Sequence, residues 1–412
     1  MRLPKPKVLF FAEGATLAHV VRPLALARAL DPDRFEVTFC RPSAYKWLTS
    51  DVKFRVVDLE CQSGSVFVRR LEKLARLYDF ATLMRYVDDD LALIDAEQPD
   101  VIVGDFRLSL SVSARLRAIP YITVCDVYWS PENSASLPLP VLGITRYLPI
   151  SVVEPLFRPM SGFASRWHAL PMERLRARYG LPSLGFDLQR CYTDADLRLF
   201  ADIPMLFPKV YPGADAAYIG PITWFPSQGA DPGVFDDDGP LVYVTMGSSC
   251  NSRLLGRIIS ILEQLDCQVM VTTAGNALTF KPTSARTRVF DYLPDDLLCQ
   301  HAQLVVCNGD SATTNQALVN GVPVLGVARN MDQFLNMQAV ERFGAGLLVR
   351  ADRASSSRLH EAAEELLREW WYTERAQKLA AGVSPESIAT VFSRHVLALC
   401  ANPAPACSIK AE

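Results

Sequence analysis

The chain alternates short apolar runs of strand type with longer segments of helical periodicity. Between the first two runs, Val20, Leu24 and Ala27 recur at helical spacing, which predicts a helix over residues 19–30. Short apolar runs predict strands in the first half at residues 7–12, 35–40, 54–57, 100–103, 121–124, 196–200 and 217–219. Strands separated by helices at this spacing predict a parallel sheet covered by helices.

Three segments depart from this simple alternation. Residues 66–94 have an extended helical pattern. Residues 130–182 are rich in proline and in long aromatic side chains, and we expect an irregular insertion there with one helical piece near residues 173–179. Residues 221–240 contain four prolines, three glycines and a run of three aspartates, a composition typical of a linker.

The alternation resumes after the linker. Strands are predicted at residues 241–246, 268–273, 288–292, 303–307 and 322–327, and helices at residues 253–265 and 312–320. Residues 100–105 and 303–310 resemble each other, since both begin as apolar strands and end in Gly-Asp. The sequence therefore predicts an α/β protein in which two doubly wound Rossmann-like domains face each other across a cleft.

The linker sets the expected domain boundaries. We expect an N-terminal domain over residues 1–220, a linker over 221–240 and a C-terminal domain over 241–382. Residues 383–412 should form a final helix that packs back on the N-terminal domain, followed by a tail. Ligands of doubly wound sheets bind beyond the carboxyl ends of the strands. The chemistry is therefore expected in the loops after Ala12, Val103, Met246 and Cys307.

Composition narrows the classes of function. The 42 basic and 45 acidic residues of the 412-residue chain give a net charge of −3, without the basic excess typical of nucleic-acid binding. The longest apolar runs are too short for a transmembrane helix, and the first one is too short for a signal peptide. The ten cysteines include no CxxC pair, which favours reduced thiols in a cytoplasmic protein over disulfides or a zinc site.

Two residues of the first half are suited to form a general base. His19 starts a predicted helix just after the first strand, and a helix N-terminus disfavours the charged imidazolium. Asp105 follows another strand and could fix the tautomer of the histidine and stabilise its charged form. Taken alone, each residue is more commonly explained by ordinary helix or loop hydrogen bonding. Together they could deprotonate a hydroxyl.

The second half carries two loops of small residues between a strand and a helix. Residues 308–314 present backbone amides at a helix N-terminus, which suits a phosphate, and Gly247-Ser248-Ser249 is a second loop of this type. A capped helix start, with Asp310 or Ser311 as the cap, would explain the first loop as well. Neither loop matches GxGxxG or a Walker motif, so a dinucleotide or P-loop site lacks support.

Asp332 and Gln333 lie beyond the next predicted strand. Side by side, they offer acceptors and donors suited to sugar hydroxyls. Their alternative role is to cap a helix over residues 333–343. Together with the loop at residues 308–314, these two residues form a set of polar positions that spans about 30 residues of the chain.

The order of these motifs resembles a known family. The matching positions are Asn308-Gly309, Thr313, Gln316-Ala317-Leu318, Gly321-Val322-Pro323, Asp332-Gln333 and Asn336, with residues 242–248, 291–294 and, near the start, 18–24. They resemble the donor-binding motif of inverting UDP-glycosyltransferases with the GT-B fold, in particular the bacterial macrolide-type branch. The resemblance spans residues 7–395 and implies two Rossmann-like domains around a nucleotide sugar.

The resemblance also implies roles for the matched residues. His19 would deprotonate the acceptor hydroxyl, with Asp105 as its partner. The diphosphate would lie among Gly247, Ser248, Ser249, Asn308, Gly309, Ser311 and Thr313, the ribose near Gln316, the base at Tyr292 and Leu293, and the sugar at Asp332 and Gln333. The acceptor oxygen would attack the anomeric carbon opposite the leaving nucleotide and invert its configuration. Backbone amides and the helix dipole would stabilise the diphosphate, so no metal and no cofactor beyond the nucleotide sugar are expected.

Four positions depart from the family pattern. Asn308 stands where the family has a histidine that contacts the diphosphate, and asparagine cannot supply a charge-assisted bond. Asp310 replaces a glycine, and its carboxylate would repel a diphosphate unless it points away as a cap. Gln316 replaces a glutamate that contacts ribose, and Ala18 replaces the glycine before the histidine. These changes bear on the identity of the donor more than on the activity.

The favoured function is transfer of a sugar from a UDP or dTDP sugar to a hydroxyl of a small hydrophobic or lipid acceptor. Four aromatic residues could surround the acceptor or belong to the core: Phe67, Tyr78, Tyr128 and Trp129. Four arginines of residues 66–94 could contact an anionic membrane surface or form a solvated helix face: Arg69, Arg70, Arg76 and Arg85. A sugar-nucleotide epimerase of the same fold and a non-catalytic auxiliary subunit stay open as alternatives.

Overall fold

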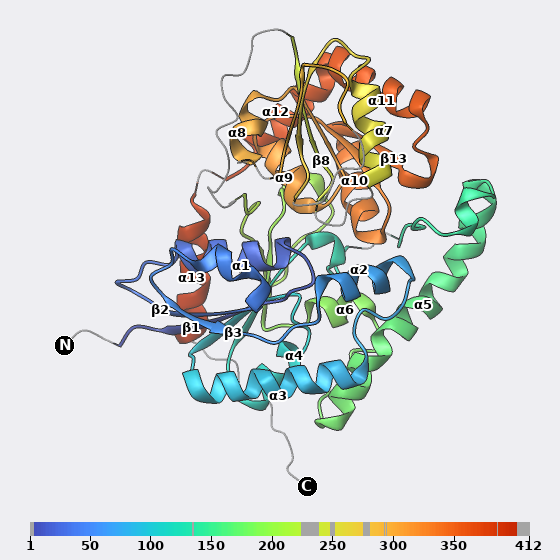
Figure 1. The fold of residues 1–412 in the computed structure, drawn as a ribbon. Coiled ribbons are helices and arrows are strands. Elements are labelled where there is room, and N and C mark those ends of the chain that lie inside the picture. Colours follow the sequence, from blue (N-terminus) through green and yellow to red (C-terminus); the bar gives the residue numbers. More distant parts are fainter. Residues whose placement is uncertain are drawn as a thin grey trace.

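Two parallel β-sheets organise the chain into an N-terminal and a C-terminal lobe, which lie one above the other in Figure 1. The computed structural model describes residues 4–133, 136–223, 239–247, 252–274, 281–291, 293, 295–384 and 386–401. Helices cover the sheets of both lobes (Figure 1). The predicted α/β fold with two facing Rossmann-like domains is confirmed.

The N-terminal sheet has seven parallel strands in the order β3-β2-β1-β4-β5-β6-β7. These strands are β1 (Lys7–Ala12), β2 (Glu36–Arg41), β3 (Arg55–Asp58), β4 (Val101–Asp105), β5 (Tyr121–Cys125), β6 (Leu197–Phe200) and β7 (Ala216–Tyr218). The helices of this lobe are α1 (Ala18–Ala29), α2 (Gly64–Glu72), α3 (Phe80–Glu97), α4 (Leu110–Leu116), α5 (Ile150–Arg178) and α6 (Leu188–Thr193). The central strands are buried along their whole length, as a parallel sheet covered on both faces requires.

The C-terminal sheet has six parallel strands in the order β10-β9-β8-β11-β12-β13. These strands are β8 (Leu241–Thr245), β9 (Gln268–Thr272), β10 (Thr287–Phe290), β11 (Leu304–Cys307), β12 (Val324–Ala328) and β13 (Gly346–Arg350). The helices of this lobe are α7 (Ser252–Leu262), α8 (Asp295–His301), α9 (Ser311–Val319), α10 (Met331–Phe343), α11 (Ser356–Arg368) and α12 (Trp370–Ala381), and the last helix of the chain is α13 (Ile388–Ala401). In both lobes the first strand lies between the second and the fourth, and this reversal of strand order opens a crevice beyond the carboxyl ends.

The strands predicted from the sequence are present to within two residues at each end. The apolar pattern does not predict β13, α8, α11 or α12. Strand β13 is a half-buried edge strand, which leaves a weak apolar signal. The two Gly-Asp motifs are not equivalent in space. Asp105 is the last residue of β4, whereas Asp310 lies beyond β11, at the start of α9.

Two expectations about helices are corrected. Residues 66–94 form two helices, α2 and α3, because Leu74 adopts a φ of +51° and Asp79 starts α3 by accepting a hydrogen bond from the amide of Thr82. The prediction of an irregular insertion over residues 130–182 is wrong, since the 29-residue helix α5 occupies most of it.

Helix α5 forms in spite of three internal prolines, Pro155, Pro159 and Pro171. Its C-terminal part packs on α3 and α6, and Ala169, Met172 and Leu175 are buried in a core that also holds residues of α3. Proline removes a backbone donor and disfavours a helix interior, which is why the sequence argued against a helix here. Tertiary packing overrides that local preference.

Helix α13 returns to the N-terminal lobe, beside α1 (Figure 1). Phe392 and Val396 are buried in the same core as Val8 and Phe10 of β1, and the rings of Phe10 and Phe392 are 6.1 Å apart. The expected domain boundaries at residues 220, 240 and 382 stay a prediction. Residues 224–238 of the expected linker lie outside the described residues.

A strap from the N-terminal lobe, residues 137–148, lies against the C-terminal lobe. The amide of Val141 donates to the carbonyl of Arg329 at 2.9 Å. Arg350 donates to the carbonyls of Leu139 and Pro140 at 2.7 and 3.1 Å. Further along, Thr145 donates to the carboxylate of Asp352. The strap leads directly into α5 and therefore ties that helix to the contact between the lobes.

Candidate active site

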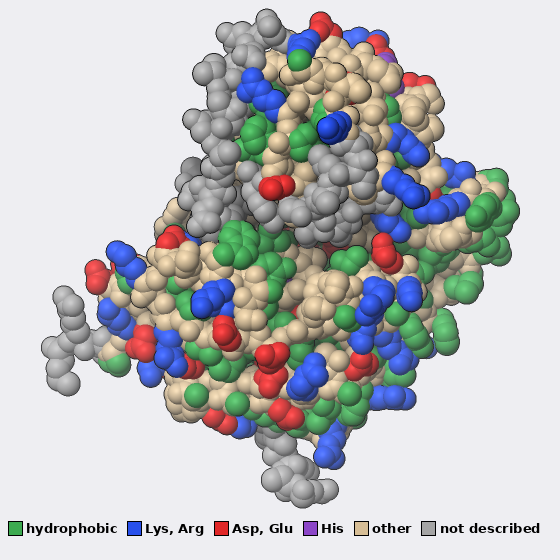
Figure 2. All heavy atoms as spheres, in the orientation of Figure 1, with side chains coloured by type: hydrophobic (Ala, Val, Ile, Leu, Met, Phe, Trp, Pro, Cys, Tyr) green, Lys and Arg blue, Asp and Glu red, His purple; other side chains and the backbone are tan. Residues whose placement is uncertain are grey.

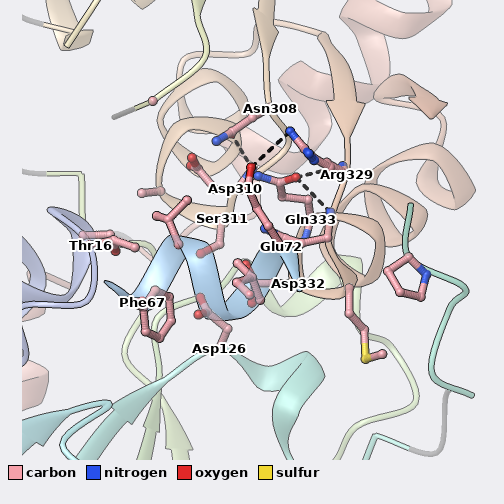
Figure 3. Close-up of a pocket in the computed structure, with 18 of the residues that line it drawn as sticks. Thr16, Phe67, Glu72, Asp126, Asn308, Asp310, Ser311, Arg329, Asp332 and Gln333 are labelled. Atoms are coloured by element: carbon pink, nitrogen blue, oxygen red, sulfur yellow. Dashed lines mark hydrogen bonds and ion pairs between the residues drawn. The ribbon is translucent and has the colours of Figure 1, made fainter. Parts of the chain in front are cut away.

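A cavity of about 1370 Å³ lies between the two lobes and is lined by both. Its walls include the residues that follow β1, β4, β8 and β11, the four positions at which the sequence predicts chemistry. In Figure 3, Phe67 and Asp126 come from the N-terminal lobe, and Asn308, Ser311 and Asp332 approach them from the C-terminal lobe. The site is therefore shared between the lobes.

His19 lines this cavity from the first turn of α1, with 18% of its side chain exposed. Its Nδ1 lies 2.7 Å from Oδ1 of Asp105, 86 residues further along the chain. Because β4 pairs with β1, Asp105 is in register with Ala12, just before the loop that leads into α1. The strand order thus brings the histidine and the carboxylate together.

Arg22, one turn after His19 on α1, holds Asp105 from the other side. Its Nε donates to Oδ2 of Asp105 at 2.7 Å and its Nη2 donates to Oδ1 at 2.9 Å, which is a bidentate pair. Its Nη1 donates to Oδ1 of Asp126, which follows β5, at 2.8 Å. Arg22, Asp105 and Asp126 are all buried, so the carboxylate beside His19 has a fixed orientation.

The charge state of Asp105 follows from these partners. Burial alone would raise its pKa, but the guanidinium of Arg22 and the imidazole of His19 outweigh burial and hold the pKa below its usual value. The ionised carboxylate can only accept hydrogen bonds, so the proton between the two residues belongs to Nδ1 of His19. In the neutral ring the lone pair is then on Nε2, the nitrogen that is suited to take a proton.

Phe106 packs against the imidazole. Its ring stacks on that of His19 at 4.9 Å with an angle of 12° between the planes, and Tyr192 contacts the Phe106 ring edge-on at 5.1 Å. Phe106 follows Asp105 directly and has a φ of +58°, which is uncommon for a residue with a side chain. Such a conformation costs about 1–3 kcal/mol and is typical of functional sites.

Asp332 approaches this group from the start of α10. Its Oδ1 accepts a hydrogen bond of 2.7 Å from Nε1 of Trp129, a residue of the N-terminal lobe. Burial, followed by the negative charge of Asp126, raises the pKa of Asp332 to about 6, against the opposing effects of Trp129 and His19. Asp332 and His19 are therefore close enough for the imidazole to affect the pKa of the carboxyl group.

Asp310 caps the start of α9. Its Oδ1 accepts a hydrogen bond of 2.9 Å from the amide of Thr313, and its own amide donates to Oδ1 of Asn308 at 3.0 Å. The interpretation of Asp310 as a helix cap is confirmed. One of the amides that could bind a phosphate is consequently already occupied by a carboxylate.

Gln333 takes part in a capping box at the start of α10. Its Oε1 accepts hydrogen bonds from the amides of Arg329 and Asn330 at 2.9 and 3.3 Å, and its amide donates to Oδ1 of Asn330 at 3.0 Å. The capping role that the sequence left open is confirmed for Gln333. Its side-chain NH2 group is the part suited to contact a sugar hydroxyl.

Nine of the predicted site residues line the cavity: His19, Asp105, Gly247, Leu293, Asn308, Ser311, Thr313, Asp332 and Gln333. Gly309 and Gln316 are not among the lining residues. Gly309 has a φ of +85°, and a Cβ there would lie 2.6 Å from Cγ of Met337, so packing explains the glycine. Gln316 is buried within α9. Three predicted residues lie outside the described part of the chain: Ser248, Ser249 and Tyr292.

The aromatic residues divide between site and core. Phe67 and Trp129 line the cavity, whereas Tyr78 and Tyr128 do not and belong to buried clusters. The sequence did not single out Arg22 or Asp126. Two signals pointed to them, since Arg22 is three residues after His19, on the same helix face, and Asp126 follows a central strand.

Within the described ranges, no group of three or more His, Cys, Asp or Glu side chains could hold a metal ion. The cysteines found in these ranges are free thiols. None of the helices described for this chain combines the length and the apolar character needed to cross a membrane.

Similar proteins point to one enzyme class. Residues 256–398 match the family described as Erythromycin biosynthesis protein CIII-like, C-terminal domain. The PGL/p-HBAD biosynthesis rhamnosyltransferase of Mycobacterium bovis (strain BCG / Pasteur 1173P2) is 41% identical over 393 residues, which are 95% of this chain and 86% of that protein.

Solved structures share the fold over nearly the whole chain. The glycotransferase of kitacinnamycin superposes with a TM-score of 0.71 at 17% identity, over 95% of this chain and 99% of that chain. The spinosyn rhamnosyltransferase SpnG, complexed with thymidine diphosphate, has a TM-score of 0.65 at 17% identity, over 95% of this chain and 100% of that chain.

The paired sheets, the cavity between them and these similarities define a nucleotide-sugar glycosyltransferase of the GT-B fold. The chain belongs to the family of the mycobacterial PGL/p-HBAD biosynthesis glycosyltransferases, and its residues 256–398 match the erythromycin CIII-like C-terminal domain. The resemblance stated from the sequence is confirmed. The enzyme class also sets aside the epimerase and the auxiliary subunit as alternatives.

Proposed function

We propose that this enzyme transfers a deoxyhexose, such as rhamnose, from a dTDP or UDP sugar to a hydroxyl of a lipid-like acceptor, with inversion at the anomeric carbon. The observation that carries the proposal is the His19–Asp105 pair on the wall of the interlobe cavity, opposite the loops before α9 and α10. The choice of sugar and acceptor draws on the relative that is named a PGL/p-HBAD biosynthesis rhamnosyltransferase. The diphosphate draws on SpnG, complexed with thymidine diphosphate.

In the proposed reaction, Nε2 of His19 takes the proton of the acceptor hydroxyl. The oxygen forms a bond to the anomeric carbon while the bond from that carbon to the nucleoside diphosphate breaks on the opposite face. Asp105 accepts from Nδ1 and stabilises the imidazolium as it forms. Arg22 keeps Asp105 ionised and in place, which makes it a positioning residue.

The donor is proposed to bind along the C-terminal wall. Ser311 and the amides at the start of α9 face the cavity and are suited to the diphosphate, while Leu293, which also lines the cavity, would contact the nucleotide base. Asn308 can donate to a phosphate oxygen through its side-chain NH2 group. Asp332 and the NH2 group of Gln333 would contact the hydroxyls of the sugar.

The acceptor is proposed to bind along the N-terminal wall. Phe67, Leu71 and Leu77 line the cavity near α2, and Phe157 and Trp167 line it on α5. This apolar lining suits a hydrophobic chain. The cavity volume of about 1370 Å³ lies above the 300–1,000 Å³ common for small-molecule sites, which leaves room for two substrates at once.

The test is direct assay of transfer. The purified enzyme is incubated with dTDP-rhamnose or with UDP-glucose and a short-chain alkylphenol, and the anomeric configuration of the product is read by NMR. We expect a product of inverted configuration, with dTDP-rhamnose preferred. A product of retained configuration, or transfer undiminished in His19→Ala, would contradict the proposed mechanism. Turnover of the donor to an epimer without acceptor would contradict the proposed reaction.

A further inference from the structure

Helix α5 exposes an unusual amount of apolar side chain. Of the fifteen large hydrophobic side chains that are exposed in the described chain, eight lie between residues 144 and 167. They are Ile144, Tyr147, Leu148, Val152, Leu156, Met160, Phe163 and Trp167. Single exposed hydrophobic residues are normal on a protein surface, but a contiguous set marks an interaction surface. We refer to these eight residues as the α5 apolar face.

The five residues on the helix itself form one stripe. They follow one another at intervals of 4, 4, 3 and 4 residues, which places them within an arc of roughly 80° around a regular helix. Figure 2 shows hydrophobic side chains gathered at the right-hand edge of the molecule, where Figure 1 places α5. The helix projects there from the body of the protein, so a flat partner could reach the stripe.

The α5 apolar face is continuous with the wall of the active-site cavity. Phe163 and Trp167 belong to the stripe and also line the cavity. Phe157, Ser161 and Ala164, on a neighbouring side of the helix, line the cavity too. The exposed stripe therefore meets the cavity at Phe163 and Trp167, where a hydrophobic molecule can pass along α5 into the site.

The charges around the stripe are mainly positive. The segment from residue 144 to 167 contains three basic residues, Arg146, Arg158 and Arg166, and one acidic residue, Glu154. It is therefore positively charged, although the whole chain has a net charge of −3. Arg76 lies over the ring of Trp167 at 4.3 Å and donates to its backbone carbonyl at 2.8 Å. Apolar residues flanked by arginines, with a tryptophan at the boundary, are typical of a helix that lies in a membrane interface.

We propose that the α5 apolar face docks the enzyme on an anionic lipid bilayer, so that a lipid acceptor moves from the membrane along α5 to His19. The bilayer is the occupant that these observations favour, because its acyl region matches the apolar stripe and its headgroups match the arginines. The route to His19 rests on the proposed function, whereas the docking itself does not. Residues 137–148 tie the base of α5 to the C-terminal lobe, so docking places the cavity entrance at the membrane surface.

The test uses the full-length enzyme and sedimentation with vesicles of phosphatidylcholine alone or mixed equally with phosphatidylglycerol. The variant Val152→Gln/Leu156→Gln/Met160→Gln removes three stripe residues that do not line the cavity, and glutamine preserves helix propensity. A matched control, Tyr211→Gln/Trp370→Gln, removes hydrophobic residues that are 80% and 69% exposed elsewhere. We expect the stripe variant to lose at least about tenfold in partition to the mixed vesicles, and the control to bind as the unmodified enzyme does.

Two further readouts complete the design. Binding should be stronger to the mixed vesicles than to phosphatidylcholine and should weaken as salt is added. The stripe variant should keep transfer to a short-chain acceptor in solution and lose transfer to a long-chain acceptor held in vesicles. Equal sedimentation of the stripe variant and the unmodified enzyme would overturn the proposal. So would a dimer in solution that the stripe variant converts to monomer, since the face would then join two copies. Vesicle binding without any sugar transfer would instead reject the proposed function and leave the docking intact.

Discussion

The indole Nε1 of Trp129 donates a hydrogen bond of 2.7 Å to Oδ1 of Asp332, and this bond joins the N-terminal wall of the cavity to its C-terminal wall. Trp129 belongs to the N-terminal lobe and Asp332 opens α10 in the C-terminal lobe. A sugar bound to Asp332 would therefore lie against the same indole that borders the proposed acceptor site. Because the bond from Trp129 lowers the pKa of Asp332, a movement of one lobe relative to the other that breaks the bond would change the charge of Asp332.

Replacement of Asp332 by asparagine should change how stability depends on pH. Its pKa is raised to about 6 in the folded protein, against about 3.9 for an unfolded chain, so the folded state holds the proton more tightly. Its contribution to stability is therefore largest below about pH 4 and declines as the pH rises to about 6. We expect the Tm of the unmodified enzyme to fall relative to that of Asp332→Asn over this range. Calorimetry checks this, with the exposed Asp266→Asn as the control. A constant difference in Tm would contradict it.

Removal of the candidate base should leave binding intact and stop the chemistry. We expect His19→Ala to lower kcat by about 10²–10⁴-fold, the contribution typical of a positioned general base. The thermal shift produced by dTDP should persist, because the donor is proposed to bind on the opposite wall. Steady-state kinetics and a thermal-shift titration measure the two effects. A kcat within a few-fold of the unmodified enzyme would remove His19 from the mechanism.

Asp105→Asn should cost both activity and stability at neutral pH. Asparagine cannot balance the buried guanidinium of Arg22, and removal of one partner from a buried pair costs about 3–5 kcal/mol. Because the folded-state pKa of Asp105 is below its unfolded value, its stabilising effect is full above about pH 4 and is lost at lower pH. The difference in unfolding free energy should therefore shrink on acidification. Urea titrations over a series of falling pH values measure it, and a difference that does not shrink at all across the series would contradict the assignment.

Asp310→Asn should improve use of the donor. Asparagine keeps the side-chain oxygen that caps α9 but removes a negative charge from the wall on which the diphosphate is proposed to bind. We expect the KM for the donor to fall by a factor on the order of five, with Tm nearly unchanged. Asp310→Ala is the matched control, since it removes the cap as well and should lower stability by about 1 kcal/mol. An unchanged KM in Asp310→Asn would show that the carboxylate does not face the diphosphate.

Arg350→Lys should loosen the strap over residues 137–148. Arg350 donates to two carbonyls of the strap, and its guanidinium lies over the ring of Phe334 at 4.7 Å. Lysine cannot reproduce this planar arrangement of donors. We expect faster proteolysis within the strap and a higher KM for a long acceptor. Arg358→Lys, at an exposed position on α11, serves as the control. Equal proteolysis in both variants would show that Arg350 does not hold the strap.

The sequence was sufficient for every strand of the two sheets except the edge strand β13, but not for α5. Strands such as β4 and β8 are short apolar runs bounded by turn residues, so their position follows from local pattern. Helix α5 owes its C-terminal part to packing against α3, which brings together residues that are distant in the chain. Because internal prolines disfavour a helix, the local sequence pattern around its three prolines does not predict α5.

The site divides in a similar way. The pairing of His19 with Asp105 follows from two adjacent parallel strands, and a predicted strand order is enough to anticipate it. The bond between Trp129 and Asp332 depends on how the lobes meet, for which the sequence holds no signal. The capping roles of Asp310 and Gln333 were open alternatives, and the backbone conformation decided them.

Helix α13 has a mechanical consequence. Because Phe392 and Val396 are part of the N-terminal core, the polypeptide passes from one lobe to the other twice, once before β8 and again after α12. Two covalent connections between the lobes restrict their free rotation relative to each other more than a single connection would. It also follows that cutting the chain at the first crossing would separate α13 from the N-terminal lobe, so the N-terminal fragment should not fold as the intact lobe does.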